Sequence, residues 1–264
     1  MNVFVFDIET VPDVEGGRRL YGLDGLDDTA VADAMFARRR QESGGSDFLR
    51  HHLHRISVIS IAARLGERFK VWSLGDAGST EKEVIERFFD GIDRYTPTLV
   101  SWNGSGFDLP VLHYRALRHG VAAPRYWENG ANDQSFRWNN YLSRFHERHT
   151  DLMDVLAGYQ PRASVRLDEM ATLCGFPGKL GMSGDKVWEC IRQGQFGIVR
   201  DYCETDVLNT YLLYLRFQLM RGQLDDNGYR RESRLVRDTL EAEEKPHFAE
   251  FLAAWDPEPA SVIG

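Results

Sequence analysis

The sequence predicts an α/β fold with a mixed β-sheet. Its segments follow one another in the order strand, long insertion, two strands, helix, strand, helix, which is typical of that fold class. The two consecutive strands are separated by the turn-like sequence LGER at residues 65–68, which predicts a hairpin. With 264 residues, 42% of them hydrophobic, the chain can bury the core of one large domain.

The first half of the chain supplies four strands and two helices. Apolar runs predict strands at residues 3–8, 55–63, 69–74 and 98–102. An N-cap signal at residues 79–83 starts a helix that runs to about residue 94, and a second helix spans residues 109–118. Residues 11–54 form a long insertion with its own helix near residues 29–41, and loops of this length tend to be functional.

The second half is predicted to be mainly helical. An irregular aromatic stretch covers residues 122–149, and a short element follows at residues 151–157. Helices are expected at residues 165–174, 183–192 and 196–221, the last with a nearly continuous apolar face. We expect residues 1–222, insertion included, to form one domain. Residues 223–264 are expected to form a helical extension with a loose tail, packed on the same domain.

Composition narrows the class of protein. No apolar run reaches the roughly 18 residues of a membrane span and no signal peptide is visible, so we expect a cytoplasmic location and no membrane partner. Cys174, Cys190 and Cys203 lack CxxC spacing, which argues against a zinc site or a disulfide framework. The net charge of −8 argues against a non-specific DNA coat protein but not against a nuclease.

Two acids, Asp7 and Glu9, stand at the end of the first strand. Residues two apart share a face of a strand, so these carboxylates project together while Phe6 and Ile8 point to the opposite side. Such a pair repels by about 1 kcal/mol in water at 4 Å, and by more when partly buried. It therefore has a raised pKa or binds a cation, and Mg²⁺ prefers oxygen ligands. Alone, the pair is equally compatible with a solvent-facing strand end.

Two further segments contribute acids. SWNGSGFDLPVL places Asp108 at the start of a helix, where its charge also suits the helix dipole. In DYCETDVLNTYLLYL, Tyr202 and Asp206 lie one helical turn apart and share a face. The apolar residues after Asp206 predict a helix packed on the core, and an acid buried there needs a counter-charge.

With these segments together, the sequence resembles the DEDD superfamily of 3′→5′ exonucleases, in its tyrosine-containing (DEDDy) branch. DIE at 7–9, NGSGFD at 103–108 and YCETD at 202–206 match its three motifs in order and spacing. ETVPD, RFHERHTDLMDVL and GDKVWE resemble stand-alone bacterial proteins related to the proofreading exonuclease domain of family B DNA polymerases. The resemblance implies an RNase H-like (ribonuclease H-like) fold: a five-stranded mixed β-sheet flanked by α-helices.

The resemblance also implies an activity. The expected enzyme is a metal-dependent 3′→5′ exonuclease that releases nucleoside 5′-monophosphates from single-stranded nucleic acid with a free 3′ end, DNA being favoured. In the family's two-metal scheme, Asp7, Glu9, Asp108 and Asp206 would hold two divalent ions, Mg²⁺ or Mn²⁺, with Asp7 bridging them. Tyr202 would orient the attacking water, and Glu9 would accept a hydrogen bond from the terminal 3′-hydroxyl.

Other residues near the motifs are candidates for substrate binding. Asn103 and Phe107 adjoin the second motif, where an aromatic ring can stack on a terminal base. Lys179 and Lys186 can contact phosphate, and Asp151 is suggested by the resemblance but can equally cap a helix. Further positions weighed are Arg38 to Arg40 and Arg50 as strand contacts, Trp102 as core, and His113 and His119 as structural or surface residues.

Three alternatives stay open. The chain can be a catalytically inactive exonuclease fold that binds nucleic acid, or an exoribonuclease directed at RNA. A phosphatase of the aspartate-nucleophile type also begins with an apolar strand and an aspartate, but it needs a second aspartate where Glu9 stands. It would also leave Tyr202 and Asp206 without a role.

Overall fold

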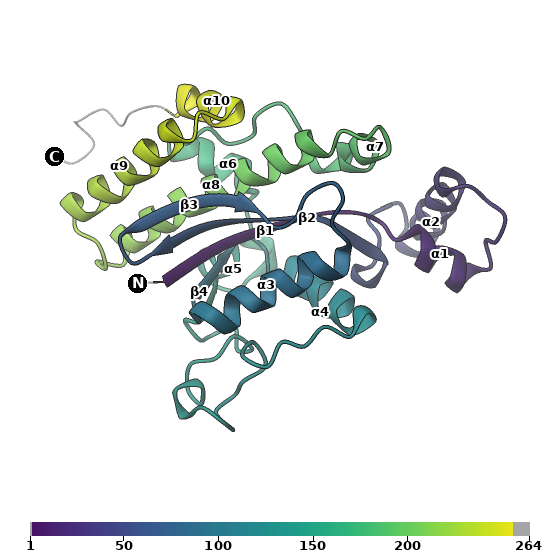
Figure 1. The fold of residues 1–264 in the computed structure, drawn as a ribbon, viewed down its shortest axis with the longest axis horizontal. Helices are drawn as coiled ribbons and strands as arrows, with labels where there is room; N and C mark the ends of the chain where they lie inside the picture. Colours follow the sequence, from purple (N-terminus) through teal and green to yellow (C-terminus); the bar gives the residue numbers. More distant parts are fainter. Residues whose placement is uncertain (1, 256–264) are drawn as a thin grey trace.

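A five-stranded mixed sheet forms the centre of the molecule, which is a computed structural model that describes residues 2–255 (Figure 1). The sheet has the order β3-β2-β1-β4-β5. Its strands are β1 (Asn2–Pro12), β2 (His54–Leu65), β3 (Arg68–Ser73), β4 (Thr98–Ser101) and β5 (His149–Asp151). β2 pairs antiparallel with β1 and β3, whereas β4 pairs parallel with β1 and β5. The mixed sheet and the β2–β3 hairpin are confirmed.

The central strand β1 is buried on both faces. Val3 and Val5 belong to the hydrophobic cluster that contains α8 (Phe196–Met220). Phe4, Phe6 and Ile8 pack on the other side, in the cluster that contains α3 (Glu81–Tyr95) and α4 (Asp108–His119). The strand therefore separates two half-cores, and its alternating side chains fix which face each later residue occupies.

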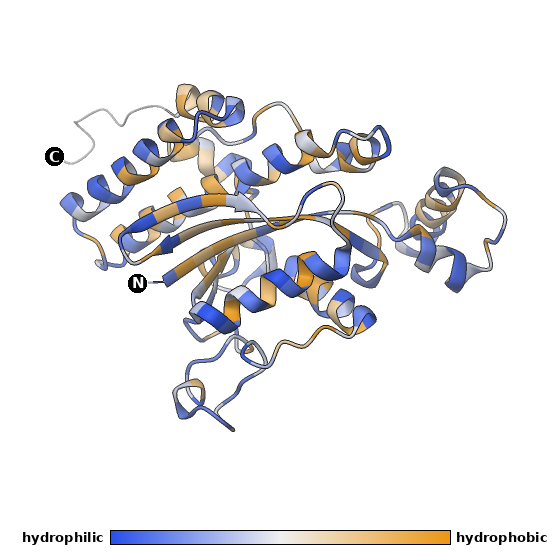
Figure 2. Cartoon of the chain, viewed as in Figure 1, coloured by the Kyte–Doolittle hydropathy of each residue, from blue (hydrophilic) through white to orange (hydrophobic). Residues whose placement is uncertain are grey.

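Helices cover both faces of the sheet (Figure 1). α3 and α4 lie on one face of the sheet, and α8 lies on the other. Three short helices pack on the same side as α8, namely α5 (Leu152–Leu156), α6 (Leu167–Leu173) and α7 (Val187–Arg192). Figure 2 shows hydrophobic residues concentrated in the strands and hydrophilic residues on the outer helices. The predicted start of α3 is confirmed, because Thr80 and Glu83 form a reciprocal capping box.

The insertion folds into two helices, α1 (Val14–Tyr21) and α2 (Asp28–Ser43), followed by the short 3₁₀ helix η1 (His51–Leu53). Figure 1 shows α1 and α2 as a lobe that projects from one end of the sheet. The prediction that the insertion starts at residue 11 was wrong, because β1 continues to Pro12 in register with His54. The predicted helix at residues 29–41 lies within α2, whereas α1 was not predicted.

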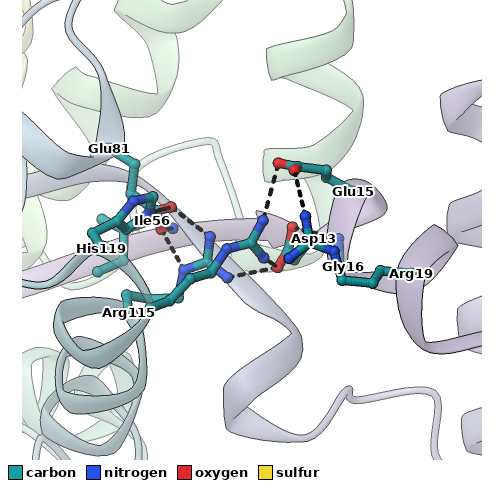
Figure 3. Close-up of polar contacts among 9 residues, drawn as sticks. Asp13, Glu15, Gly16, Arg19, Ile56, Glu81, Arg115 and His119 are labelled. Atoms are coloured by element: carbon teal, nitrogen blue, oxygen red, sulfur yellow. Dashed lines mark hydrogen bonds and ion pairs between the residues drawn. The ribbon is translucent and has the colours of Figure 1, made fainter.

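A buried ionic network, here called the anchor network, ties this lobe to the body of the domain (Figure 3). The Arg115 guanidinium donates to the Asp13 carboxylate at 2.6 Å and, through Nε, to the Glu81 carboxylate at 2.8 Å. Arg118 also donates to Asp13, and the His119 Nε2 lies 2.7 Å from Glu81. Arg115 and its two acids are nearly inaccessible to solvent, so each buried charge has a partner of opposite sign inside the chain.

Two C-terminal helices, α9 (Asp226–Ala242) and α10 (Pro246–Ala254), pack on the same core as the sheet. Val236 and Phe248 share the cluster of Val3 and α8, and Arg64 of β2 pairs with Glu232 of α9 at 2.8 Å. The domain boundary at residue 222 stays a prediction, and the expected loose tail falls on residues 256–264, outside the described residues. Across residues 2–255, no helix is long and apolar enough to cross a membrane.

Candidate active site

The carboxylates of the first and second motifs meet where β4 ends. β4 pairs with β1 through Val5 and ends at Ser101, so among residues 2–255 no strand pairs with this edge of β1 beyond Val5. There the backbone N–H of Ile8 donates to Asp108 Oδ1 at 3.1 Å, a contact between residues 100 apart in the chain. This hydrogen bond places Asp108, the first residue of α4, beside Asp7 and Glu9.

The third motif reaches the same place from α8. Asp7 and Glu9 lie on the face of β1 that also carries Val3 and Val5, against which α8 packs. The Tyr202 and Asp206 side chains share a hydrogen bond on α8. Cys203, which follows Tyr202 in the sequence, contacts the first motif, because its Sγ lies 3.5 Å from Asp7 Oδ2. The structure thus brings together all five residues that the motifs predict: Asp7, Glu9, Asp108, Tyr202 and Asp206.

Electrostatics strain this acid cluster, by which we mean Asp7, Glu9, Asp108 and Asp206. Burial raises the pKa of Asp7 and of Glu9 well above the ordinary values, and the neighbouring carboxylates raise both further. Burial also raises the pKa of Asp108 to about 7, against the lowering effect of the Ile8 N–H, and that of Asp206 to about 7. The four groups resist full ionisation without a cation.

The donor set of the acid cluster fits a divalent cation. In the part of the chain that the structure describes, none of its four carboxylates forms an ion pair with Lys, Arg or His. Ligand atoms of Asp7, Glu9 and Cys203 lie within 4.8 Å of one another, a spacing compatible with one metal ion. Oxygen-rich sites of this kind suit hard cations. Burial and the adjacent acids raise the pKa of the Cys203 thiol, which therefore stays protonated at neutral pH.

A cleft of about 360 Å³ opens onto the acid cluster, and we call it the catalytic cleft. Asp7, Tyr202 and Asp206 line it together with two predicted residues, Asn103 and Lys179. Lys179 lies close enough to Asp206 to oppose the rise in the pKa of that carboxyl.

Two residues of the catalytic cleft were not predicted to line it. Trp102 packs against the core cluster, as expected, but it also lines the cleft and donates from Nε1 to the Val165 carbonyl at 3.0 Å. Arg166 lines it as well and gives it a second cation, although Arg166 also pairs with Asp168 at 3.1 Å. A lone arginine outside the motifs carries no sequence signal, because only the fold shows which surface it faces.

Asp151 holds the loop of the second motif. Its carboxylate accepts the backbone N–H groups of Asn103 at 2.9 Å and of Ser105 at 2.8 Å. Asn103 has a left-handed backbone with φ 66°, a conformation that costs free energy in a residue other than glycine. Asp151 therefore offsets the cost of the turn that leads to Asp108, and it also caps α5.

Phe107 and Lys186 lie away from the catalytic cleft. The Phe107 ring packs against Phe48 at a centroid distance of 5.4 Å and against His54 at 5.1 Å, at the root of the lobe. Lys186 lines a neighbouring cavity of about 510 Å³ together with Cys190 and residues of α10. The structure therefore does not bring either side chain to the acid cluster, and their roles in substrate binding stay predictions.

The arginines of the insertion are engaged within the lobe. Arg38 pairs with Glu42 at 3.1 Å, Arg50 with the same carboxylate group at 3.4 Å, and Arg40 with Asp47 at 3.5 Å. Arg39 donates to the Phe48 carbonyl at 2.8 Å. The two carboxylates of Glu42 and Asp47 therefore offset part of the charge of these four arginines, which present less positive charge to a nucleic acid than the sequence suggests.

Comparison with solved structures finds polymerases and exonucleases. The family B DNA polymerase of Pyrobaculum calidifontis matches with a TM-score of 0.49 and 19% identity, covering 83% of this chain and 24% of that one. E. coli Exonuclease I in complex with a dA16 oligonucleotide matches with a TM-score of 0.33 and 14% identity, covering 83% and 45%. Among curated proteins, DNA polymerase 1 of Sulfurisphaera ohwakuensis is 49% identical over 39 residues, 15% of this chain and only 4% of its own length.

Comparison with protein families gives a match over most of the chain. Residues 46–255 match the family described as "Predicted 3'-5' exonuclease related to the exonuclease domain of PolB". This range contains Asp108, Tyr202 and Asp206, while Asp7 and Glu9 precede it and join the cluster through the register of β1. A family of this kind implies dependence on a divalent metal. The chain belongs to this family of 3′→5′ exonucleases, as the three motifs predicted.

Proposed function

We propose that this exonuclease removes nucleoside 5′-monophosphates from the free 3′ end of single-stranded nucleic acid, with DNA preferred, and that two Mg²⁺ or Mn²⁺ ions bind at the acid cluster. One observation carries the proposal: four carboxylates from three distant segments converge beside the catalytic cleft, and within residues 2–255 none of them forms an ion pair with Lys, Arg or His. Such repulsion is offset where a bound cation completes the site, just as Arg115 offsets the charges of Asp13 and Glu81 in the anchor network.

Asp7, Glu9, Asp108 and Asp206 would hold the metal. When bound, divalent ions supply charge that stabilises both the attacking and the leaving oxygen of a phosphodiester. The chain itself contributes rigidity, because β1 is anchored by Phe6 and Ile8 on the opposite face.

Tyr202 has the role of orienting the attacking water. Burial and the surrounding acids raise the pKa of its hydroxyl far above the ordinary value, so it acts as a hydrogen-bond donor and not as a base. Glu9 would accept a hydrogen bond from the terminal 3′-hydroxyl, which restricts attack to free ends. Lys179 and Arg166 line the catalytic cleft and would bind phosphates of the strand.

The test is hydrolysis of a 5′-labelled single-stranded DNA oligonucleotide with Mg²⁺ or Mn²⁺. We expect a ladder of oligonucleotides that shorten from the 3′ end, with free 5′-mononucleotide as the product. No product should form in EDTA. An oligonucleotide blocked at its 3′ end should resist. Hydrolysis of the RNA oligonucleotide of the same sequence shows whether DNA or RNA is preferred. Faster cleavage of RNA would contradict the proposed preference for DNA. Intact substrate under all conditions would leave the inactive nucleic-acid-binding module as the better account.

A further inference from the structure

The insertion returns to the sheet through the sequence HHLH, and two of its histidines contact the loop that leads to Asp108. The His51 Nε2 lies 2.9 Å from the Gly106 carbonyl oxygen. Because a carbonyl oxygen only accepts hydrogen bonds, His51 donates this one from Nε2. The His54 ring packs edge-on against Phe107 at a centroid distance of 5.1 Å. The end of the insertion therefore lies against the two residues that directly precede Asp108.

The loop that carries Gly106 is a tight turn, so its residues move together. The backbone N–H groups of Gly106 and Phe107 both donate to the Asn103 carbonyl at 3.0 Å. A Cβ at Gly106 would lie 2.4 Å from Asn103 Oδ1, so the turn has no room for a side chain there. The Asp151 carboxylate holds the start of the loop at the N–H of Asn103, whereas His51 holds its end. The loop is thus fixed from β5 on one side and from the insertion on the other.

His54 connects the same loop to the first motif. Its Nε2 lies 3.1 Å from the Leu49 carbonyl oxygen, and its Nδ1 lies 2.8 Å from the Thr10 hydroxyl oxygen. Burial lowers the pKa of His54 to about 4, so the ring is neutral at pH 7 and carries one exchangeable proton. That proton is on Nε2, which faces the carbonyl, and Nδ1 accepts from Thr10. Because Thr10 follows Glu9 and the ring also packs on Phe107, His54 contacts a residue beside an acid in each of two motifs.

Electrostatic repulsion explains why the loop needs these supports. The charge of Asp108 raises the pKa of Asp7, so the two carboxylates favour moving apart. Asp7 stands in the central strand of the sheet, whereas Asp108 stands where a loop meets a helix and is the easier of the two to displace. A site whose ligands are already in place binds its ion more tightly, because binding then involves less reorganisation.

We propose that His51 is a positioning residue that, through the Gly106 carbonyl, holds Asp108 in the acid cluster where the divalent cation would bind. His54 supports the same arrangement by joining the loop to the first motif. This inference rests on the proposed function, because the cation is the one proposed for the acid cluster. It gives the insertion a role in the reaction that requires no contact between the lobe and the substrate.

The first experiment measures metal binding without substrate. Mn²⁺ is titrated into wild type, His51→Leu and His51→Gln, and free Mn²⁺ is measured by electron paramagnetic resonance. Leucine cannot donate a hydrogen bond, whereas the glutamine amide can donate to the Gly106 carbonyl in place of Nε2. We expect the dissociation constant of His51→Leu to rise by about fivefold or more, and that of His51→Gln to stay within about twofold of wild type.

His52→Leu and His52→Gln are the matched controls, because His52 is the exposed neighbour of His51 in the same short helix. Both should bind Mn²⁺ like wild type. A purely structural role for His51 would lower the melting temperature of His51→Leu and leave its dissociation constant unchanged. We expect the reverse, with a melting temperature in EDTA within about 3 °C of wild type, because one partly exposed hydrogen bond is lost.

A second experiment tests the position of the loop directly. In EDTA, amide hydrogen exchange at residues 103–108 and at Ile8 should be faster in His51→Leu than in wild type. Ile8 reports on Asp108, because its N–H donates to that carboxylate at 3.1 Å. Peptides from α8 should exchange at the wild-type rate, and His51→Gln should exchange like wild type throughout.

The outcomes separate this inference from the proposed function. Unchanged Mn²⁺ binding in His51→Leu, or unchanged exchange at residues 103–108, would overturn the role of His51 and leave the acid cluster as the metal site. A wild type that binds no Mn²⁺ would instead reject the proposed function. The exchange experiment would then decide the inference alone, since faster exchange in His51→Leu would still support His51 as the residue that positions Asp108.

Discussion

Asp7 and Asp13 lie on the same stretch of chain, and Asp108 and Arg115 lie on the same helix, yet the two pairs have opposite electrostatic environments. In the anchor network, Asp13 and Glu81 bind the Arg115 guanidinium between them (Figure 3). In the acid cluster no Lys, Arg or His of residues 2–255 pairs with the carboxylates. Buried acids with internal partners hold the fold together, whereas buried acids without them require an external cation.

The largest expected effect is on catalysis. Asp7→Asn keeps the shape of the acid cluster but removes one charge, and we expect hydrolysis to slow by about 10³-fold or more because metal binding stabilises the charge of the transition state. The assay is release of mononucleotide from single-stranded DNA with Mn²⁺. In EDTA the variant should unfold at the same or a higher temperature than wild type, since repulsion is reduced. Wild-type activity in this variant would remove Asp7 from the site.

A substitution in the anchor network should lower the stability of the protein, whereas Asp7→Asn should not. Arg115→Met removes the fully buried cation that Asp13 and Glu81 share and leaves them only Arg118 and His119 as partners, so we expect a loss of about 3 kcal/mol in the free energy of unfolding. Denaturant unfolding measures it, and Arg68→Met, at an exposed arginine of β3, is the matched control. A loss as small as that of the control would show that the network contributes little to stability.

Stabilisation by metal should depend on the acid cluster and not on the anchor network. Mn²⁺ at 100 times its dissociation constant should raise the free energy of unfolding of wild type by about 2.7 kcal/mol. The same addition should do nothing for Asp206→Asn and should still act on Arg115→Met, because only the first variant alters a ligand. Thermal unfolding with and without Mn²⁺ gives the values. Equal stabilisation of all three proteins would place the metal elsewhere.

Tyr202→Phe tests whether Tyr202 orients the attacking water without contributing to metal binding. The hydroxyl is lost while the ring and the carboxylates remain, so we expect hydrolysis to slow by about 10²-fold with the Mn²⁺-induced stabilisation unchanged. Single-turnover rates on the same oligonucleotide measure the effect. Unchanged turnover would show that Tyr202 only packs beside Asp206.

The smallest effect is a dependence of stability on pH. The pKa of Asp206 is raised to about 7 in the folded protein, so the folded state holds this proton more tightly than the unfolded chain does. In EDTA its contribution to stability is present below the ordinary pKa of 3.8 and is lost as the pH rises through about 7. Wild type should therefore lose more stability than Asp206→Asn between pH 5 and pH 8. Parallel unfolding curves for the two proteins would contradict this.

Sequence reasoning located most elements, and its failures have physical reasons. The helix α1 was missed because Gly16 and Gly17 suggest a turn, yet the glycines are required by close packing: a Cβ would lie 2.4 Å from the Asp13 carboxylate at Gly16 and 2.4 Å from the Met35 sulfur at Gly17. The strand β5 was missed because it is only three residues long and lacks an apolar run. Its pairing with β4 creates it, and pairing partners are not visible in a local pattern.

The candidate site, like the fold, was predicted in part from the sequence and in part was visible only in the tertiary structure. Periodicity and motif spacing in the sequence alone determined that Asp7 and Glu9 share a face, that Tyr202 and Asp206 share another, and that Asp108 opens a helix, because these relations are local. Only the tertiary structure decided which buried acids meet an arginine and which meet each other. It also decided that His51, at the end of the insertion, contacts the loop that leads to Asp108. Charge balance and such contacts depend on residues distant in the chain, so they arise only when the elements pack.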